Sequence, residues 1–136
     1  MNTELQMTIA IDLKKMRIRI HKKVLHAIGK PKYIQLLVNP GIKAVAVRAV
    51  AQDEPHEYAE RISPLDMMSE NSFELYSKTF INKLPELING RDTNKTYRLY
   101  GFFVKEQNMA VFSLDTLEVI DLQEGDNNVW KISKNA

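Results

Sequence analysis

Two five-residue segments near the start of the chain, at residues 7–11 and 16–20, alternate large apolar side chains with polar or small ones. Strict alternation is typical of a β-strand with one buried face, and the four residues between the segments provide a short connection. The pattern places the isoleucines of the second segment toward a core, and Arg17 and Arg19 toward solvent. A chain that begins in this way is constrained to build its core on a sheet.

The period of the pattern changes at His21. Val24, Leu25 and Ile28 follow with helical spacing, and Gly29 comes next. A glycine directly after the last periodic residue is typical of a helix C-terminus. The sequence therefore predicts a helix of about two turns that ends before Gly29.

A β-hairpin is expected after this helix. Pro31 prevents the helix from continuing, and strands are predicted at residues 33–38 and 44–50. The turn between them is predicted at residues 39–41, where Asn, Pro and Gly follow one another. The first part of the chain thus predicts a strand, a short helix and a hairpin.

The second part of the chain predicts the same order of elements. A strand is expected at residues 73–76, followed by a helix with Ser77 as its N-cap and Gly90 beyond its end. The apolar side chains of this helix are Phe80, Ile81 and Leu84. The hairpin strands are expected at residues 97–104 and 109–114. The alternation at residues 73–76 is out of phase with that at residues 17–20. An internal repeat is therefore a hypothesis, and two unrelated halves are the alternative.

Residues 51–72 differ from both flanking segments. They contain prolines, serines and acidic residues, so we expect an acidic connector with about one helical turn near residues 58–62. This divides the chain into a basic N-terminal half (1–50), the connector (51–72) and an acidic second half with a C-terminal tail (73–136). We expect one compact α+β unit, in which two strand–short helix–β-hairpin halves form a small barrel-like β core.

Charge is divided between the two ends of the chain. Residues 1–50 hold ten Lys/Arg against two acids, a net charge of +8, whereas residues 51–136 carry a net charge of −6. The basic half predicts a polyanionic partner, with nucleic acid as the first candidate. The alternative is a domain whose charges merely segregate, since no run of basic residues exceeds two.

Residues 19–29, followed by the predicted hairpin, resemble the swapped-hairpin DNA-binding family typified by AbrB, SpoVT, MazE and MraZ. Domains of that family have a strand, a short helix that ends in Leu-Gly, and a β-hairpin. Two copies interlock into a small barrel, and basic residues on one face contact DNA; MraZ carries two copies in one chain. His21 stands where the family usually has proline, and Pro31-Lys32-Tyr33 replaces its common Gly-Asp. The resemblance implies a homodimer on double-stranded DNA.

The basic residues around the second predicted strand are the candidate site. Outward residues of one strand lie about 7 Å apart, close to the phosphate spacing along one DNA strand. The expected DNA-binding residues are Lys14, Lys15, Arg17, Arg19, His21, Lys22 and Lys23. The alternative is that Arg17 and Arg19 pair with acids on a neighbouring strand or in the connector.

Signatures of other functions are absent from the sequence. It has no cysteine and no nucleophile-elbow or phosphate-loop motif, so we expect neither enzymatic activity nor a cofactor. His21 and His26 lie five residues apart and would not share a helix face, so no metal site is expected. Apolar stretches too short to cross a bilayer and the lack of cysteine favour a cytoplasmic protein.

These observations predict a non-enzymatic, bacterial-type DNA-binding transcriptional regulator. The alternative is a protein–protein interaction module, for instance an accessory protein of a mobile element, whose basic face binds an acidic partner. The aromatic residues Tyr97, Tyr100, Phe102 and Phe103 are expected in a packed core rather than stacked on single-stranded nucleic acid. Trp130 leaves two alternatives, a terminal strand docked on the sheet or a contact with a partner.

Overall fold

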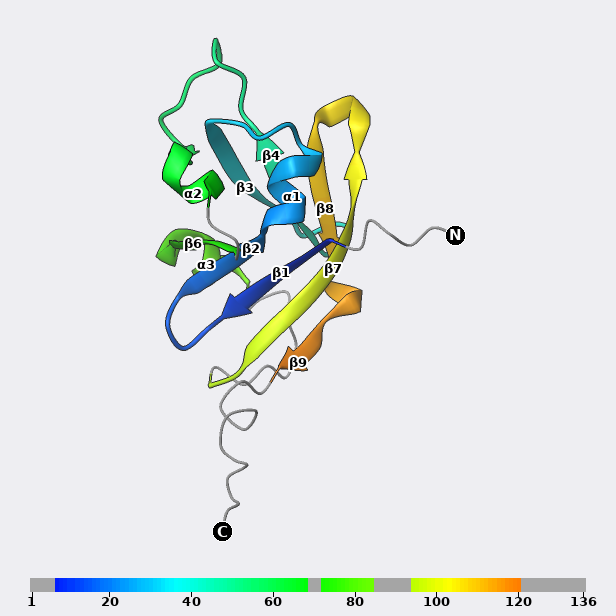
Figure 1. Cartoon of the computed structure of the whole chain (residues 1–136). Helices are drawn as coiled ribbons and strands as arrows, with labels where there is room; N and C mark the ends of the chain where they lie inside the picture. Colours follow the sequence, from blue (N-terminus) through cyan, green and yellow to red (C-terminus); the bar gives the residue numbers. More distant parts are fainter. Residues whose placement is uncertain (1–6, 69–71, 85–93, 121–136) are drawn as a thin grey trace.

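The computed structural model describes residues 7–68, 72–84 and 94–120 (Figure 1). The elements in chain order are β1 (Met7–Asp12), β2 (Arg17–His21), α1 (Lys22–Ala27), β3 (Tyr33–Asn39), β4 (Ala44–Ala49), β5 (Glu60–Arg61), α2 (Pro64–Met68), β6 (Ser72–Tyr76), α3 (Lys78–Lys83), β7 (Thr96–Val104), the 3₁₀ turn η1 (Lys105–Gln107), β8 (Met109–Ser113), the 3₁₀ turn η2 (Leu114–Thr116) and β9 (Glu118–Ile120). Each of the seven strands expected from the sequence is present, within one residue at either end.

The described strands form one antiparallel sheet that curls into a half-barrel (Figure 1). The strand order is β5-β3-β4-β8-β7-β1-β2-β6, and β9 pairs with the start of β7. The expected class is therefore confirmed at this level: a mixed α+β protein, mostly strands, with few short helices.

The core lies on the concave face of the sheet. Alternate residues of β1 and β2 are buried there, as the alternation predicts, and Ile18 and Ile20 are fully buried. Helix α1 packs beside β1 and β2, and α3 beside β3. The residues of these two helices and of their C-caps that complete the core are Val24, Leu25, Ile28, Phe80, Ile81 and Leu84.

Both longer helices begin where the sequence predicts. His21 is the N-cap of α1 and accepts a hydrogen bond on Nδ1 from Lys23 N–H at 3.1 Å. Ser77 is the N-cap of α3, where its hydroxyl accepts from Phe80 N–H at 3.3 Å. Gly29 follows α1 with φ of +93°, the left-handed conformation expected after a helix C-terminus. The expected role of Gly90 lies outside the described residues.

The helical turn expected near residues 58–62 is wrong. Glu60 and Arg61 form the short strand β5, which pairs with β3, and a helix, α2, begins later at Pro64. The helix starts there because Ser63 and Asp66 form a capping pair: Ser63 N–H donates to the Asp66 carboxylate at 2.8 Å, and Asp66 N–H donates to the Ser63 hydroxyl at 3.1 Å. Proline is favoured at the first helical position.

Strand β7 is the centre of the sheet. It pairs with β1 along one edge and with β8 and β9 along the other. Gly101 lies where β7 meets β8, directly opposite Phe112. A Cβ atom at this position would lie 2.3 Å from the carbonyl oxygen of Val111 and 2.4 Å from the Phe112 ring, so only glycine fits without a shift.

Candidate nucleic-acid interface

The outer face of β2 carries the candidate arginines. Because Ile18 and Ile20 are buried in the core, Arg17 and Arg19 project from the opposite face, as predicted. Strand β2 lies between β1 and β6, so each arginine has a neighbouring strand on both sides. These neighbours determine what the two guanidinium groups contact.

Both arginines form ion pairs within the protein. Arg19 lies opposite Glu74 of β6, and its Nε donates to Oε2 of that carboxylate at 2.8 Å. Arg17 donates to Oδ2 of Asp12 on β1 at 3.2 Å, and its other Nη atom lies 3.7 Å from Glu74. This is pairing with acids on neighbouring strands, the alternative that the sequence left open. The four side chains form a cluster without net charge.

The lysines of the candidate site differ from the arginines. Lys14 and Lys15 are exposed in the turn between β1 and β2, and Lys23 is exposed at the start of α1 beside the half-buried Lys22. Within the described residues, none of these four ammonium groups forms an ion pair. The two lysine pairs lie beyond opposite ends of β2, a five-residue strand about 13 Å long.

His21 lies between the arginines and the second lysine pair. Its outward position at the end of β2 allows Nδ1 to cap α1, which requires that nitrogen to be unprotonated. The pKa of His21 is lowered below its usual value, first by partial burial and second by the charge of Lys23. At neutral pH this side chain therefore supplies a cap rather than a positive charge. His26 is exposed.

Two further arginines on the outer face are paired with acids that sequence reasoning did not assign to them. Arg98 of β7 lies 3.5 Å from Glu118, which stands opposite it on β9. Arg48 of β4 donates to Glu54 in the connector, and this hydrogen bond, followed by one from Ala51 N–H, lowers the pKa of Glu54. The strand register places Glu118 opposite Arg98, whereas the turn at residues 51–54 returns Glu54 to Arg48, six residues earlier in the chain.

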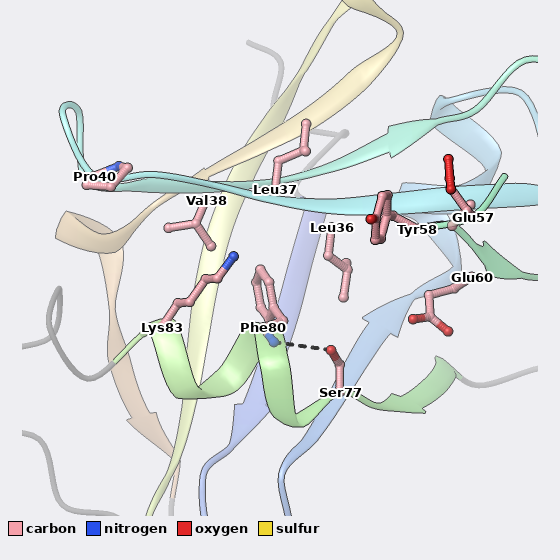
Figure 2. Close-up of a pocket in the computed structure, with 11 residues that line it drawn as sticks. Leu36, Leu37, Val38, Pro40, Glu57, Tyr58, Glu60, Ser77, Phe80 and Lys83 are labelled. Carbon is pink, nitrogen blue, oxygen red and sulfur yellow. Dashed lines mark hydrogen bonds between the residues drawn. The ribbon is translucent and has the colours of Figure 1, made fainter. Parts of the chain in front are cut away.

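A groove lies between β3 and α3. It has a volume of about 880 Å³. Figure 2 shows Leu36 and Val38 projecting from β3 into it above Phe80 of α3. Lys83 stands at one end, and Tyr58 with two connector carboxylates at the other. No sequence pattern pointed to this groove, because its walls come from three separate segments.

A second apolar surface covers the outer face of β3, β4 and β8. The side chains on it include Leu37, Ala46 and Val111, which lie side by side in the register. Phe102, opposite Val111 on β7, is 59% exposed, and Ile42 in the nearby turn is 65% exposed. The core location expected for the aromatic set is therefore correct for Tyr97, which is buried, and wrong for Phe102. Trp130 lies outside the described residues.

Among the residues that the structure describes, no three His, Cys, Asp or Glu side chains gather as metal ligands would. None of the helices described is long and apolar enough to span a bilayer. No family model, curated protein or solved structure matches this chain.

Proposed function

We propose that this protein is a non-enzymatic DNA-binding transcriptional regulator of the AbrB-like type. The observation that carries the proposal is the pair of lysine groups at the two ends of β2, at residues 14–15 and 22–23, whose charges no described carboxylate neutralises. Lysine acts as a point charge and can meet a phosphate without the fixed geometry of a guanidinium fork. The phosphate contacts are therefore assigned to these lysines.

Arg17 and Arg19 have a secondary role in this proposal. Their ion pairs hold them on the outer face of β2, between the two lysine pairs. A phosphate that approaches this face must compete with Asp12 and Glu74 for the guanidinium groups. The arginines would thus add to binding only where DNA displaces a carboxylate, and His21 would add charge only when it is protonated.

The strand pairings support two related halves. The strands can be matched in order, β1 with β5, β2 with β6, β3 with β7 and β4 with β8. When each strand is replaced by its match, six of the eight described pairings become pairings that are also present in the sheet. For example, β1 beside β7 becomes β5 beside β3. We propose that the chain contains two strand–helix–hairpin units related by an approximate two-fold axis, as two interlocked swapped-hairpin domains would be.

The test is fluorescence anisotropy of a labelled random duplex at several salt concentrations. Lys22→Ala/Lys23→Ala and Lys14→Ala/Lys15→Ala should each weaken binding, and each should reduce the slope of log K against log salt by about 1.8. Lysine variants are preferable to Arg17→Ala/Arg19→Ala, because loss of the arginines also leaves Asp12 and Glu74 without their partners.

The matched control is Lys105→Ala/Lys43→Ala, which removes two exposed lysines from turns outside β2. This variant should keep the wild-type salt slope. Absence of duplex binding by the wild type at low salt would refute the proposal. Equal losses in the control and in the β2 variants would show that the interface lies elsewhere.

A second candidate function is a protein–protein interaction module, for instance an accessory protein of a mobile element. The neutralised arginine cluster favours it, because a face of paired charges can exchange partners with a mixed-charge protein surface. Such binding would depend less on salt than DNA binding and would not be competed by plasmid DNA.

The proposal includes a homodimer, and we assign its contact to the apolar outer face of β3, β4 and β8. A two-fold contact needs a self-complementary patch, and an apolar face that includes exposed Ile42 and neighbouring Phe102 meets this need. Sedimentation equilibrium should give a dimer for the wild type and a monomer for Ile42→Lys/Phe102→Lys. A wild-type monomer would remove this part of the proposal.

A further inference from the structure

The two hairpins of the sheet differ in what covers their outer edges. In the hairpin of β7 and β8, the other edge of β7 pairs with all six residues of β1. In the hairpin of β3 and β4, the other edge of β3 pairs only with the two residues of β5, at Tyr33 and Ile34. The rest of the β3 edge therefore has no strand beside it among the described residues, and the groove of Figure 2 lies there.

The phase of the hydrogen bonds shows which backbone groups face the groove. Val50 N–H donates to the carbonyl of Tyr33 at 2.9 Å, so odd-numbered residues of β3 face β4. Ile62 N–H donates to the carbonyl of Lys32 at 2.8 Å on the opposite side. Residues 36 and 38 consequently direct their N–H and C=O groups away from β4 and into the groove.

The side chains around this edge suit an extended segment. Leu36 and Val38 project toward Phe80, so the groove is apolar beside the open backbone groups (Figure 2). Its ends carry opposite charges: Lys83 lies beneath Val38, and Glu57 and Glu60 lie toward the start of β3. In the β7 edge, the equivalent space is filled by the alternate apolar side chains of β1, which are almost completely buried.

We propose that this edge binds an extended segment of a partner protein, which adds a strand antiparallel to β3. The segment would run from the Lys83 end to the Glu57 and Glu60 end, as β1 runs antiparallel along β7. Its chemistry is an acidic residue, two apolar residues at alternate positions and then a basic residue. The backbone groups of Leu36 and Val38 supply the hydrogen bonds, and the apolar groove with its two charged ends supplies specificity.

Amide hydrogen exchange of the full ¹⁵N-labelled chain tests this inference, with the synthetic peptide acetyl-Glu-Ser-Val-Thr-Ile-Lys-amide as the probe, whose last residue would lie opposite Gln35 and so stops short of β5. In the free protein, the amides of Leu36 and Val38 should exchange at least about tenfold faster than those of Gln35 and Leu37, which face β4. Saturation with peptide should slow the first pair about tenfold and leave the second pair unchanged.

Charge variants test the direction of the bound strand. Lys83→Glu should weaken the peptide about two- to fivefold, the effect expected of one exposed ion pair. The same variant should prefer a peptide in which the terminal Glu and Lys are exchanged. Lys105→Glu, the same charge change in the turn between β7 and β8, should alter neither affinity.

Three outcomes would overturn the inference. Protection of Leu36 and Val38 in the free chain would mean that the chain already covers this edge. Protection that rises with protein concentration without peptide would identify a second copy as the occupant. Unchanged exchange at millimolar concentrations of both peptides would mean that the edge binds no such strand. None of these measurements uses DNA, so each outcome leaves the proposed DNA-binding function to its own test.

Discussion

Replacement of Glu74 by glutamine tests whether the arginines of β2 serve ion pairs within the protein or contacts with DNA. The Glu74 carboxylate lies 2.8 Å from Arg19 and 3.7 Å from Arg17, and it is the only described acid that contacts both. The glutamine keeps the shape of the side chain and one hydrogen-bond acceptor. It removes one negative charge from a cluster that holds two positive and two negative charges.

The effect on stability should be small. Arg19 and Glu74 side chains are 34% and 39% exposed, so solvent screens their attraction, and such pairs contribute about 0.2–1 kcal/mol. Arg17 keeps Asp12 at 3.2 Å and should lose little. We expect the free energy of unfolding to fall by about 0.5 kcal/mol, with a Tm decrease of about 1–3 °C in a thermal scan followed by circular dichroism.

The effect on DNA binding should be opposite in sign. With Glu74 neutral, Arg19 is available to a phosphate, so Glu74→Gln should bind a random duplex more tightly than the wild type at low salt. The slope of log K against log salt should become steeper by up to about 0.9, the value for one additional neutralised phosphate. Anisotropy titrations at four salt concentrations would measure both quantities.

Glu54→Gln is the matched control, because it also removes a carboxylate from an arginine, here Arg48 of β4. In the strand order, β4 is separated from β2 by three strands, so this variant changes the net charge equally but far from the proposed interface. Equal gains in affinity for both variants would refute the reasoning, since only net charge would then matter. No gain for Glu74→Gln would show that Arg19 does not approach DNA.

Three further predictions concern stability and pH. Gly101→Ala should lower the free energy of unfolding by about 1–3 kcal/mol in urea titrations, because its methyl group would overlap a backbone carbonyl; an unchanged midpoint would contradict the packing described. The pKa of His21, followed by NMR, should lie below 6.5, because partial burial and then the charge of Lys23 disfavour the protonated ring. Stability should therefore fall as pH decreases below 6.5, where protonation of Nδ1 also breaks the bond from Lys23 N–H. The lowered pKa of Glu54 predicts a stabilising contribution that is present above about pH 4.5 and lost in stronger acid; Glu54→Gln should remove this part of the pH dependence.

The local elements of this protein could be predicted from its sequence because each depends on residues close together in the chain. Alternation fixed which face of β2 is buried, and His21, Gly29 and Ser77 marked helix ends through bonds or backbone conformations within a few residues. The helix that begins at Pro64 could also have been predicted from the sequence, because Ser63 and Asp66 have capping-box spacing. The acidic composition of the connector instead favoured an irregular segment.

The candidate site depends on tertiary structure to a much greater degree. The sequence identified a basic segment, but its alternation could not show that β6 would place Glu74 opposite Arg19, 55 residues away in the chain. The open edge of β3 likewise follows from the length of β5, a strand that forms only where the connector returns to the sheet. Alternation and capping depend on residues a few positions apart, so the sequence alone determined the strands and the helix ends. Strand pairing joins segments that are far apart in the chain and depends on packing of the whole core, so only the tertiary structure decided it.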